Sequence, residues 1–304
     1  MSQIAHDKVL VSMTIDKEDP IQYKKMLFSI AYNMLGTIAD AEDMVQETYA
    51  SWLESDKSHV ANARFYLIRT ISNKCITHLN NTRRLRETYK GTWLPEPLLS
   101  EPDLEHEDLK SNLSIGFLYL LEKLTPIERG IIILREAFSM SYNEMSEIFG
   151  ITEENCRQHL SRAKKKLLDE KRRFTARSYE CETILREFIY ACESKNLDKL
   201  VKLLHEDIMA FADGGGKAPA LSRPLTGKDH IMKVMIGGIE FYRNYYKKLL
   251  LVNGLSGMAF YKDTLTSVPS ALIAIETDAD KKIVNIFYLV NPEKLQSFNM
   301  SRRN

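Results

Sequence analysis

Residues 139–168 contain two short helical segments separated by a glycine, and the second segment is basic. Ser141 and Glu144 have the spacing of a capping box, which predicts a helix beginning directly after Ser141. Gly150 can adopt the left-handed conformation that ends this helix, and Thr152 is suited to cap the next one. The segment therefore has the local signals of a helix-turn-helix, although a plain helical hairpin has the same signals.

The second of these helices has one apolar face and one polar face. Apolar residues recur at steps of four, three and four, as an amphipathic helix requires; they are Cys156, Leu160, Ala163 and Leu167. The opposite face carries Asn155, Arg157, Gln158, Ser161, Arg162 and Lys165. These side chains could contact base edges and phosphates together in a DNA major groove. The alternative is a solvated basic surface.

Composition limits the classes of protein that the chain can represent. A length of 304 residues with 44% hydrophobic residues favours two or three folded domains. The net charge of only +1 argues against a general binder of polyanions. The charge is unevenly distributed, however: residues 151–177 hold nine Lys or Arg against four acids, and residues 96–108 hold six acids and no Lys or Arg.

Nothing in the sequence calls for a metal, a cofactor or a membrane. No pair of the four cysteines has C-x-x-C spacing, so we expect buried apolar side chains rather than ligands. No apolar run reaches the roughly 20 residues that span a bilayer, and the N-terminus lacks a signal-peptide core. We therefore expect a cytoplasmic protein with no metal site.

The chain up to residue 90 reads as a first helical block. Residues 61–90 contain neither Gly nor Pro, and four apolar residues repeat there every four positions: Leu67, Ile71, Cys75 and Leu79. Asp40 is expected to cap the helix that comes before residues 61–90. That helix is expected to expose an acidic face comprising Glu42, Asp43, Gln46 and Glu47. On the residues alone, this face could equally be a solvated surface.

Residues 91–112 are expected to form a linker, and residues 113–174 a second helical block that includes the helix-turn-helix. Three prolines and several acids exclude a continuous helix in the linker. Trp93 would lower solubility if exposed, so we expect it to dock on a neighbouring domain. Thr125 and Glu128 flank a proline and predict another helix start.

Residues 178–304 have the pattern of an α+β domain. We expect helices over 180–193, 196–204 and 228–246, and strands over 258–261, 271–277 and 283–290. The last two strands are expected to form a hairpin through Asp278, Ala279 and Asp280.

Three segments in this order resemble the extracytoplasmic-function (ECF) sigma factors of bacteria. AYNMLGTIADAEDMVQETYASWL (31–53) resembles the part of sigma region two that meets the polymerase clamp, FYLIRTISNKCITHL (65–79) resembles the −10 reader, and the helix-turn-helix resembles region four. WLPEP (93–97), DGGGK (213–217) and NPEKL (291–295) further resemble the SigJ-type subgroup, which carries a C-terminal SnoaL-like domain. The resemblance implies two all-α sigma domains followed by an α+β, cone-shaped domain that regulates them within one chain. It also implies two separate DNA-binding lobes.

The resemblance implies a role for each surface. The polymerase contact would comprise Asp40, Glu42, Asp43, Gln46 and Glu47. The −10 contact would comprise Asn62 and its loop from Ser58, with Arg64, Arg69, Asn73, Lys74 and His78. At the −35 element, the base readers would be Arg157, Gln158 and Arg162, and the phosphate contacts Lys164, Lys165 and Lys166. The interdomain regulatory set would be Trp93, Leu94, Pro95, Glu96, Pro97, Asp213, Gly214, Gly215, Gly216, Lys217, Asn291, Pro292, Glu293, Lys294 and Leu295.

Core RNA polymerase and promoter DNA are therefore the expected partners, with no catalytic residue and no separate anti-sigma protein. The C-terminal domain could instead sense a small ligand of unknown chemistry or act as an enzyme, although no acid–base pair stands out. The rival for the whole chain is a helix-turn-helix transcription regulator that binds duplex DNA without polymerase.

Overall fold

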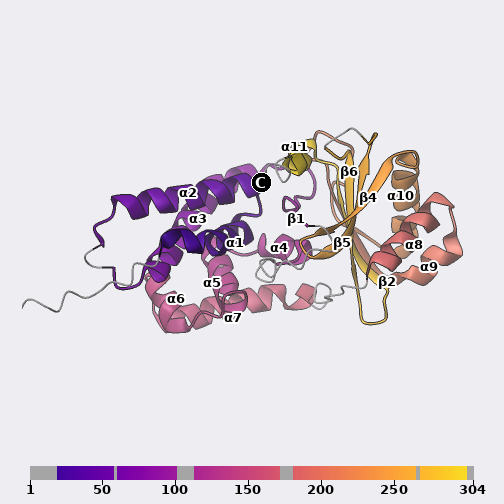
Figure 1. Ribbon diagram of the computed structural model, residues 1–304. Helices are drawn as coiled ribbons and strands as arrows, with labels where there is room; N and C mark the ends of the chain where they lie inside the picture. Colours follow the sequence, from indigo (N-terminus) through magenta and orange to yellow (C-terminus); the bar gives the residue numbers. More distant parts are fainter. Residues whose placement is uncertain (1–18, 58–59, 101–112, 172–180, 265–267, 300–304) are drawn as a thin grey trace, which may run out of the picture.

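The chain folds into two helical lobes and a sheet domain (Figure 1). The computed structural model describes residues 19–57, 60–100, 113–171, 181–264 and 268–299. We call residues 19–90 the first lobe, 113–171 the second lobe and 181–299 the sheet domain. Within the described residues, no helix is long and apolar enough to cross a bilayer, and no His, Cys, Asp and Glu side chains group to hold a metal.

The first lobe consists of three helices after a short 3₁₀ turn. They are η1 (Pro20–Tyr23), α1 (Lys24–Leu35), α2 (Ile38–Glu54) and α3 (Ala63–Glu87). The predicted apolar stripe of α3 is buried throughout. The predicted cap of α2 is wrong, because the helix begins at Ile38 and Asp40 lies in its first turn. The first amide of α2 instead donates to the Glu96 carboxylate (2.6 Å), so a linker residue caps this helix.

The second lobe confirms the local signals of the helix-turn-helix. Its helices are α4 (Ile115–Leu121), α5 (Pro126–Glu136), α6 (Tyr142–Phe149) and α7 (Glu153–Lys171). Capping boxes start α5 and α6, and Gly150 ends α6 with φ +65°. Thr152 Oγ1 accepts from the Asn155 amide at the start of α7 (3.1 Å), and the apolar stripe of α7 is buried.

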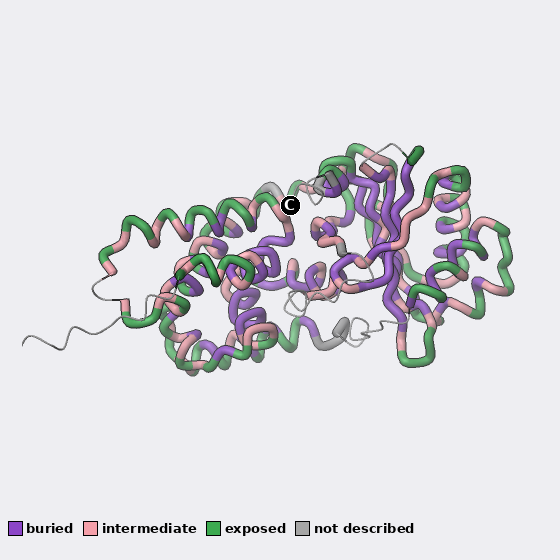
Figure 2. The backbone as a smooth tube through the Cα atoms, viewed as in Figure 1, coloured by how far each residue is buried: buried purple, intermediate pink, exposed green. Residues whose placement is uncertain are grey.

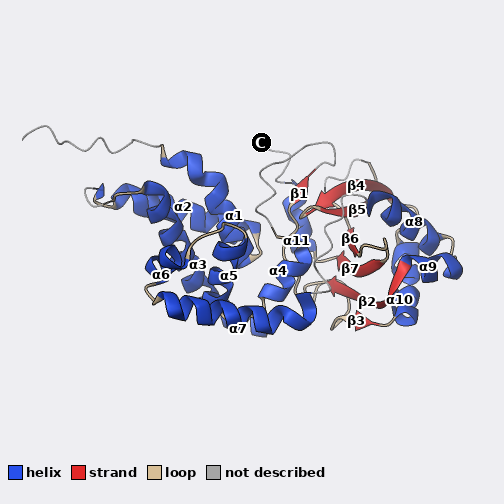
Figure 3. Cartoon of the chain, turned by 90° about the horizontal axis from the view of Figure 1, so that it is seen from below, coloured by secondary structure: helices blue, strands red, loops and turns tan. Residues whose placement is uncertain are grey.

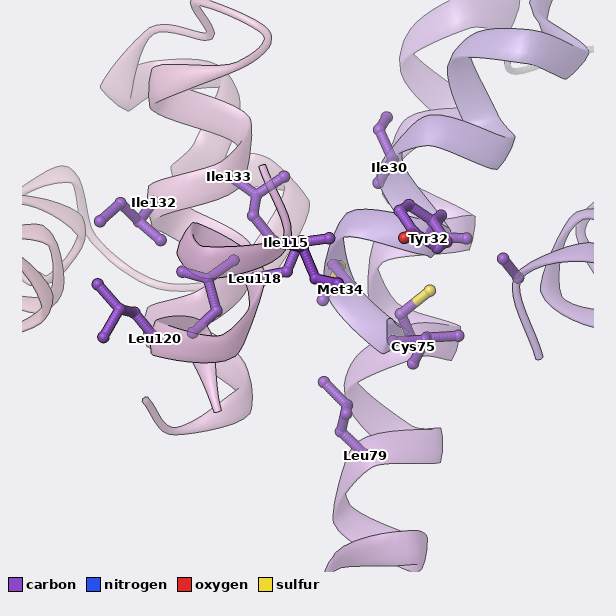
Figure 4. Close-up of a cluster of buried hydrophobic side chains, with 14 of the residues drawn as sticks. Ile30, Tyr32, Met34, Cys75, Leu79, Ile115, Leu118, Leu120, Ile132 and Ile133 are labelled. Carbon is purple, nitrogen blue, oxygen red and sulfur yellow. The ribbon is translucent and has the colours of Figure 1, made fainter. Parts of the chain in front are cut away.

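The two lobes share one hydrophobic core, so the expected separation of the lobes is absent from this structure. Met34 of α1 lies against Ile115 of α4 in the close-up of this core (Figure 4). Arg129 of α5 is 4% exposed, and it donates to the Met34 carbonyl (2.8 Å) and pairs with Glu122 (2.7 Å). Glu122 also pairs with Arg86 of α3 (2.7 Å). Burial alone would raise the pKa of Glu122, but the two arginines hold this pKa below its usual value.

The sheet domain contains a seven-stranded, mostly antiparallel sheet, and its helices over residues 181–241 cover one face (Figure 3). The strand order is β1-β4-β5-β6-β7-β2-β3, and only the β2–β7 pair is parallel. The strands are β1 (Leu99–Ser100), β2 (Leu204–Asp213), β3 (Leu225–Thr226), β4 (Tyr246–Val252), β5 (Leu255–Tyr261), β6 (Ala271–Thr277) and β7 (Ile283–Leu289). The helices are α8 (Cys181–Glu193), α9 (Leu197–Leu203), α10 (Lys228–Phe241) and α11 (Pro292–Leu295), followed by η4 (Gln296–Asn299).

The sheet confirms some predicted elements and corrects others. The hairpin between β6 and β7 is present, and Asp278 Oδ1 accepts from the amides of Asp280 and Lys282 (2.9 Å each). The helix expected over 228–246 ends at Phe241, and β4 begins at Tyr246 because its apolar run pairs with β5. Strands β2 to β4 were not predicted. The linker also contributes edge strand β1, whose Leu99 pairs with Val252.

The sheet is buried on both faces, so it acts as the middle layer of the molecule (Figure 2). Alternate strand residues pack against α8, α9 and α10 in a second core, while the others join the core of the lobes. Tyr119 of α4 contacts Phe211 of β2 on the lobe side, with ring centroids 4.9 Å apart. The second lobe and the sheet domain therefore form one packed unit.

A buried acid lies in this contact. Glu276 of β6 is 1% exposed, accepts a hydrogen bond from the Asn285 side chain (2.8 Å) and lies near Ser114, the cap of α4. Burial raises the pKa of Glu276 to about 7, against the smaller lowering effect of the two neighbouring polar side chains. The folded protein therefore keeps this acid protonated below about pH 7.

We predict that the contact between α4 and the sheet weakens as the pH rises from 5 to 8. The folded protein keeps the Glu276 proton up to its raised pKa, whereas the unfolded chain loses it near 4.5, so the free energy of unfolding falls over this interval. The expected loss is on the order of 3 kcal/mol. Denaturant titrations of wild type and Glu276→Gln should show this slope only in the wild type, and equal slopes would contradict the assignment.

Candidate functional site

The predicted −35 surface is exposed on α7. All six of its residues lie on the solvent side of the helix: Asn155, Arg157, Gln158, Ser161, Arg162 and Lys165. The guanidinium group of Arg157 pairs with Glu153 one turn earlier (2.7 Å) and lies 4.8 Å from the ring centre of Tyr142 in α6. It is thus oriented along the first turn of α7, where a recognition helix contacts bases.

The predicted phosphate contacts are not equivalent. Lys164 pairs with Glu136 (2.8 Å) and Lys166 with Glu128 (2.6 Å), both on α5. Burial would raise the pKa of Glu128, but its bonds to Lys166 and Thr125 keep that pKa low. Lys164 and Lys166 therefore tie α7 to α5, and Lys165, which is exposed, is the better candidate for a phosphate contact.

The predicted polymerase and −10 surfaces lie side by side on α2 and α3. Glu42, Asp43, Gln46 and Glu47 are exposed, and Asp40 is partly exposed. Across the groove between the helices, Lys74 pairs with Glu47 (3.1 Å) and His78 lies 3.6 Å from Asp40. Two of the proposed DNA contacts therefore face the acids proposed to contact polymerase.

The remaining −10 candidates differ in their surroundings. Asn73 donates to the Ile148 carbonyl of α6 (3.0 Å), and the charge of Arg64 contributes to the low pKa of Glu144, whose main cause is its bonds to Ser141. Asn62 caps α3 by accepting from an amide in its first turn, and Arg69 is exposed. Ser58 and His59 lie outside the described residues.

The three motifs of the predicted regulatory set meet in one cluster, which we call the clasp: residues 93–97, 213–217 and 291–295 together with Tyr89. Its centre is Asp213, which is fully buried at the end of β2. The Asp213 carboxylate accepts from the Tyr89 hydroxyl (2.5 Å), the Leu94 amide (2.9 Å) and the Lys294 ammonium group (2.7 Å). One carboxylate thus binds a residue at the end of the first lobe, one in the linker and one in the last helix of the sheet domain.

Lys294 is the buried cation of the clasp. Its ammonium group also donates to the Leu94 carbonyl and lies 4.3 Å from the ring centre of Trp93. Burial lowers the pKa of Lys294 to about 8, although Asp213 opposes this shift. Arg86 stacks on Trp93 as well, with 3.8 Å from its guanidinium carbon to the ring centre. The predicted docking of Trp93 is confirmed, and the ring lies among cations from both domains.

Glycines are needed where the motifs come closest. Gly215 has φ +61°, and a Cβ there would lie 2.5 Å from the side-chain nitrogen Nδ2 of Asn291. Gly36 after α1 has φ +73°, and a Cβ there would lie 2.5 Å from the Trp93 ring. Larger residues at either position would separate the motifs. At the edge of the clasp, Lys217 pairs with Glu293 in an exposed ion pair.

Three residues that connect the lobes, the linker and the sheet domain were not predicted from the sequence. Tyr89 belongs to the clasp, and Tyr32 donates its hydroxyl to the Glu96 carbonyl (2.6 Å). Asn253, in the turn between β4 and β5, donates to the Tyr32 hydroxyl (2.8 Å) and bonds Leu98 through its own backbone. A buried hydrogen-bonded chain therefore runs from the first lobe through the linker to the sheet domain.

Comparison with known proteins agrees with this architecture. Residues 21–85 match the family model of Sigma-70 region 2, and residues 116–167 match that of Sigma-70 region 4. The ECF RNA polymerase sigma factor SigJ of Mycobacterium tuberculosis is 29% identical over 293 residues, covering 92% of this chain and 93% of SigJ. A probable ECF sigma factor of that species, SigI, is 27% identical over 208 residues, covering 66% and 72%. The crystal structure of SigJ aligns with a TM-score of 0.71 at 30% identity, covering 90% of this chain and 95% of that one.

The chain belongs to the ECF sigma factors, with the two sigma regions followed by an α+β domain. Sigma factors are transcription initiation factors rather than enzymes. The predicted family and fold class are therefore confirmed.

We predict that the ion pair at the centre of the clasp stabilises the docked state. Lys294→Met leaves a carboxylate that is 0% exposed without its cation, which should cost about 3–5 kcal/mol in denaturant unfolding. Adding Asp213→Asn should recover a large part of this loss, because the buried charge disappears. Lys217→Met, which breaks the exposed pair with Glu293, is the control and should cost under about 1 kcal/mol. Equal effects of the two lysine substitutions would contradict the prediction.

Proposed function

We propose that this chain directs core RNA polymerase to promoters and that its sheet domain holds the sigma lobes closed until the clasp opens. The acidic face of α2 binds polymerase, α3 contacts the −10 element and α7 reads the −35 element. The sheet domain takes the place of a separate anti-sigma protein. The observation that carries this proposal is the shared core of the two lobes, braced by the clasp.

The closed arrangement is too small to span a promoter. Elements at −35 and −10 are about 25 base pairs apart, or about 85 Å along the helix axis at about 3.4 Å per pair. A compact body of roughly 155 residues is only about 40 Å across. The lobes must therefore separate before both elements are bound.

The proposed binding groups are also occupied, two of them by contacts inside the first lobe and one by a contact between the lobes. Lys74 and His78 face acids of α2, and Asn73 is bonded to α6. Polymerase competes for the acids, and movement of the second lobe frees Asn73. Binding to polymerase and access to the −10 element are in this way coupled through the same contacts.

Genome-wide run-off transcription tests the proposal. Purified core polymerase is combined with sheared genomic DNA of the source organism, and transcripts are read by sequencing. Wild type should initiate at a defined promoter class, and Lys294→Met should raise initiation severalfold while Lys217→Met leaves it unchanged. Initiation that is identical in all three proteins would contradict control by the clasp, and no initiation by any of them would contradict sigma activity.

We predict that reversing charge on α2 abolishes polymerase binding without unfolding the first lobe. Asp43→Lys with Glu47→Lys places two cations where the exposed acidic face meets a basic partner. Pull-down of core polymerase should be lost, whereas Glu54→Lys at the other end of the helix should bind normally. Retained binding by the double variant, with an unchanged circular dichroism spectrum, would refute this assignment.

We predict that Arg157 reads a base and Lys165 holds a phosphate. Arg157→Ala should cost about 1–3 kcal/mol of binding free energy and relax the base preference at one promoter position. Lys165→Ala should weaken binding to all −35 sequences alike, and it should reduce the slope of log affinity against log salt concentration by about one. Binding of the polymerase holoenzyme to a panel of −35 variants distinguishes the two; a uniform loss for Arg157→Ala would refute base reading.

A further inference from the structure

An apolar cavity of about 340 Å³ lies inside the sheet domain, between α10 and the ends of β2 and β7. The segment 218–221 closes one side, and Val234 and Phe241 of α10 line it while remaining 39% and 70% exposed. None of the described residues lining the cavity is charged. The hydroxyl groups of Tyr242 and Tyr288 lie near each other, and they are the polar side-chain atoms of the lining.

This chemistry suits a small, neutral and largely apolar molecule. The volume is in the lower part of the range of drug-sized ligand sites, and such sites are apolar with a few polar groups that orient the ligand. A charged ligand would lose its hydration with no counter-ion in the lining. A molecule with one donor or acceptor could instead bond the tyrosine pair.

The walls of the cavity are attached to the clasp. Ala212 precedes Asp213 on β2, and because strand residues alternate, one lines the cavity while the other faces the lobes. Val290 of the lining donates its amide to the Asp213 carbonyl (2.9 Å), and Ala218 donates to the Gly214 carbonyl (3.0 Å). Movement of these walls therefore moves the residues that hold the clasp.

The cavity also touches the linker directly. Leu221 lines the cavity, and its carbonyl oxygen would lie 3.4 Å from a Cβ added at Gly91, two residues before Trp93. The segment 218–221 is thus held between the cavity on one side and the start of the linker on the other. A closed clasp keeps this wall in place.

We propose that this cavity is a receptor site for a small neutral apolar molecule and that its occupation stabilises the closed clasp. This deepens the proposed function, on which its regulatory meaning rests. A ligand shifts a protein toward the conformation that it binds more tightly. Because the walls are complete when the clasp is closed, the ligand favours the closed form, and by reciprocity opening the clasp weakens ligand binding by the same factor.

Gly238 allows the cavity to be filled selectively. It lines the cavity on α10, and a Cβ there would meet no atom within 4 Å, so a larger side chain would enter the open space. Gly237 also has no atom within 4 Å of an added Cβ, but it is exposed and is absent from the lining. The two adjacent glycines therefore provide a matched pair, and replacing either one removes a helix-weakening residue.

The test is a fluorescence titration of the full-length protein with N-phenyl-1-naphthylamine, a neutral apolar probe with one N–H group. Wild type should bind one equivalent. Gly238→Leu should weaken the affinity at least tenfold and Gly238→Ala by an intermediate factor, while Gly237→Leu should stay within twofold. Wild-type affinity in a folded Gly238→Leu protein, or no saturable binding in the wild type, overturns the receptor site.

Coupling to the clasp has its own readout. Lys294→Met should weaken probe binding at least threefold, and an unchanged affinity overturns the coupling. These titrations contain no polymerase, so their outcome is separate from that of the transcription experiment. If promoter-specific initiation fails but probe binding still depends on Gly238, the proposed function is wrong and the receptor site is supported. If initiation succeeds but the probe does not bind in the cavity, only the receptor site is wrong.

Discussion

The buried carboxylate of Asp213 is the interaction on which the arrangement of this sigma factor depends. A carboxylate without water needs a compensating cation and hydrogen bonds, and these come from the first lobe, the linker and the last helix of the sheet domain. Breaking any one contact leaves a charged group buried and underbonded. Docking of the three partners is therefore expected to be cooperative, as the proposed switch requires.

The clasp acts on a sigma module that is itself closed. Arg129 and Glu122 link the two lobes at a buried position, and the core of α1, α4 and α5 continues across them. The sheet adds a third side, because Tyr119 and the cap of α4 rest on it. The proposed opening would therefore expose apolar surface at two interfaces, and polymerase and DNA would have to supply comparable contacts in return.

Local signals in the sequence predicted local structure well. The capping residues Ser141 and Thr125, Gly150 and the stripe from Cys156 act within one or two turns, so neighbouring residues determine them. The pairing partners of the clasp were not predictable in this way. Tyr32, Tyr89 and Asn253 are single polar residues far apart in the chain, and only the tertiary structure brings them to their hydrogen-bond partners.

Strand β4 illustrates the same limit. Its apolar run follows α10 without a proline, so the pattern suited a longer helix, and pairing with β5 decided the outcome. The closed packing of the lobes is also non-local, since each lobe has helical periodicity that is satisfied in either the open or the closed state.

The most direct test of the central claim is the distance between the lobes, measured by double electron–electron resonance. Spin labels at Ala50→Cys on α2 and Glu147→Cys on α6 lie on exposed positions outside the proposed binding sets, and the four native cysteines are buried. The free protein should show one short, narrow distance that broadens in Lys294→Met and lengthens by about 30 Å or more with core polymerase and promoter DNA. The same distance in the free and polymerase-bound proteins would contradict a closed sigma factor that opens to act.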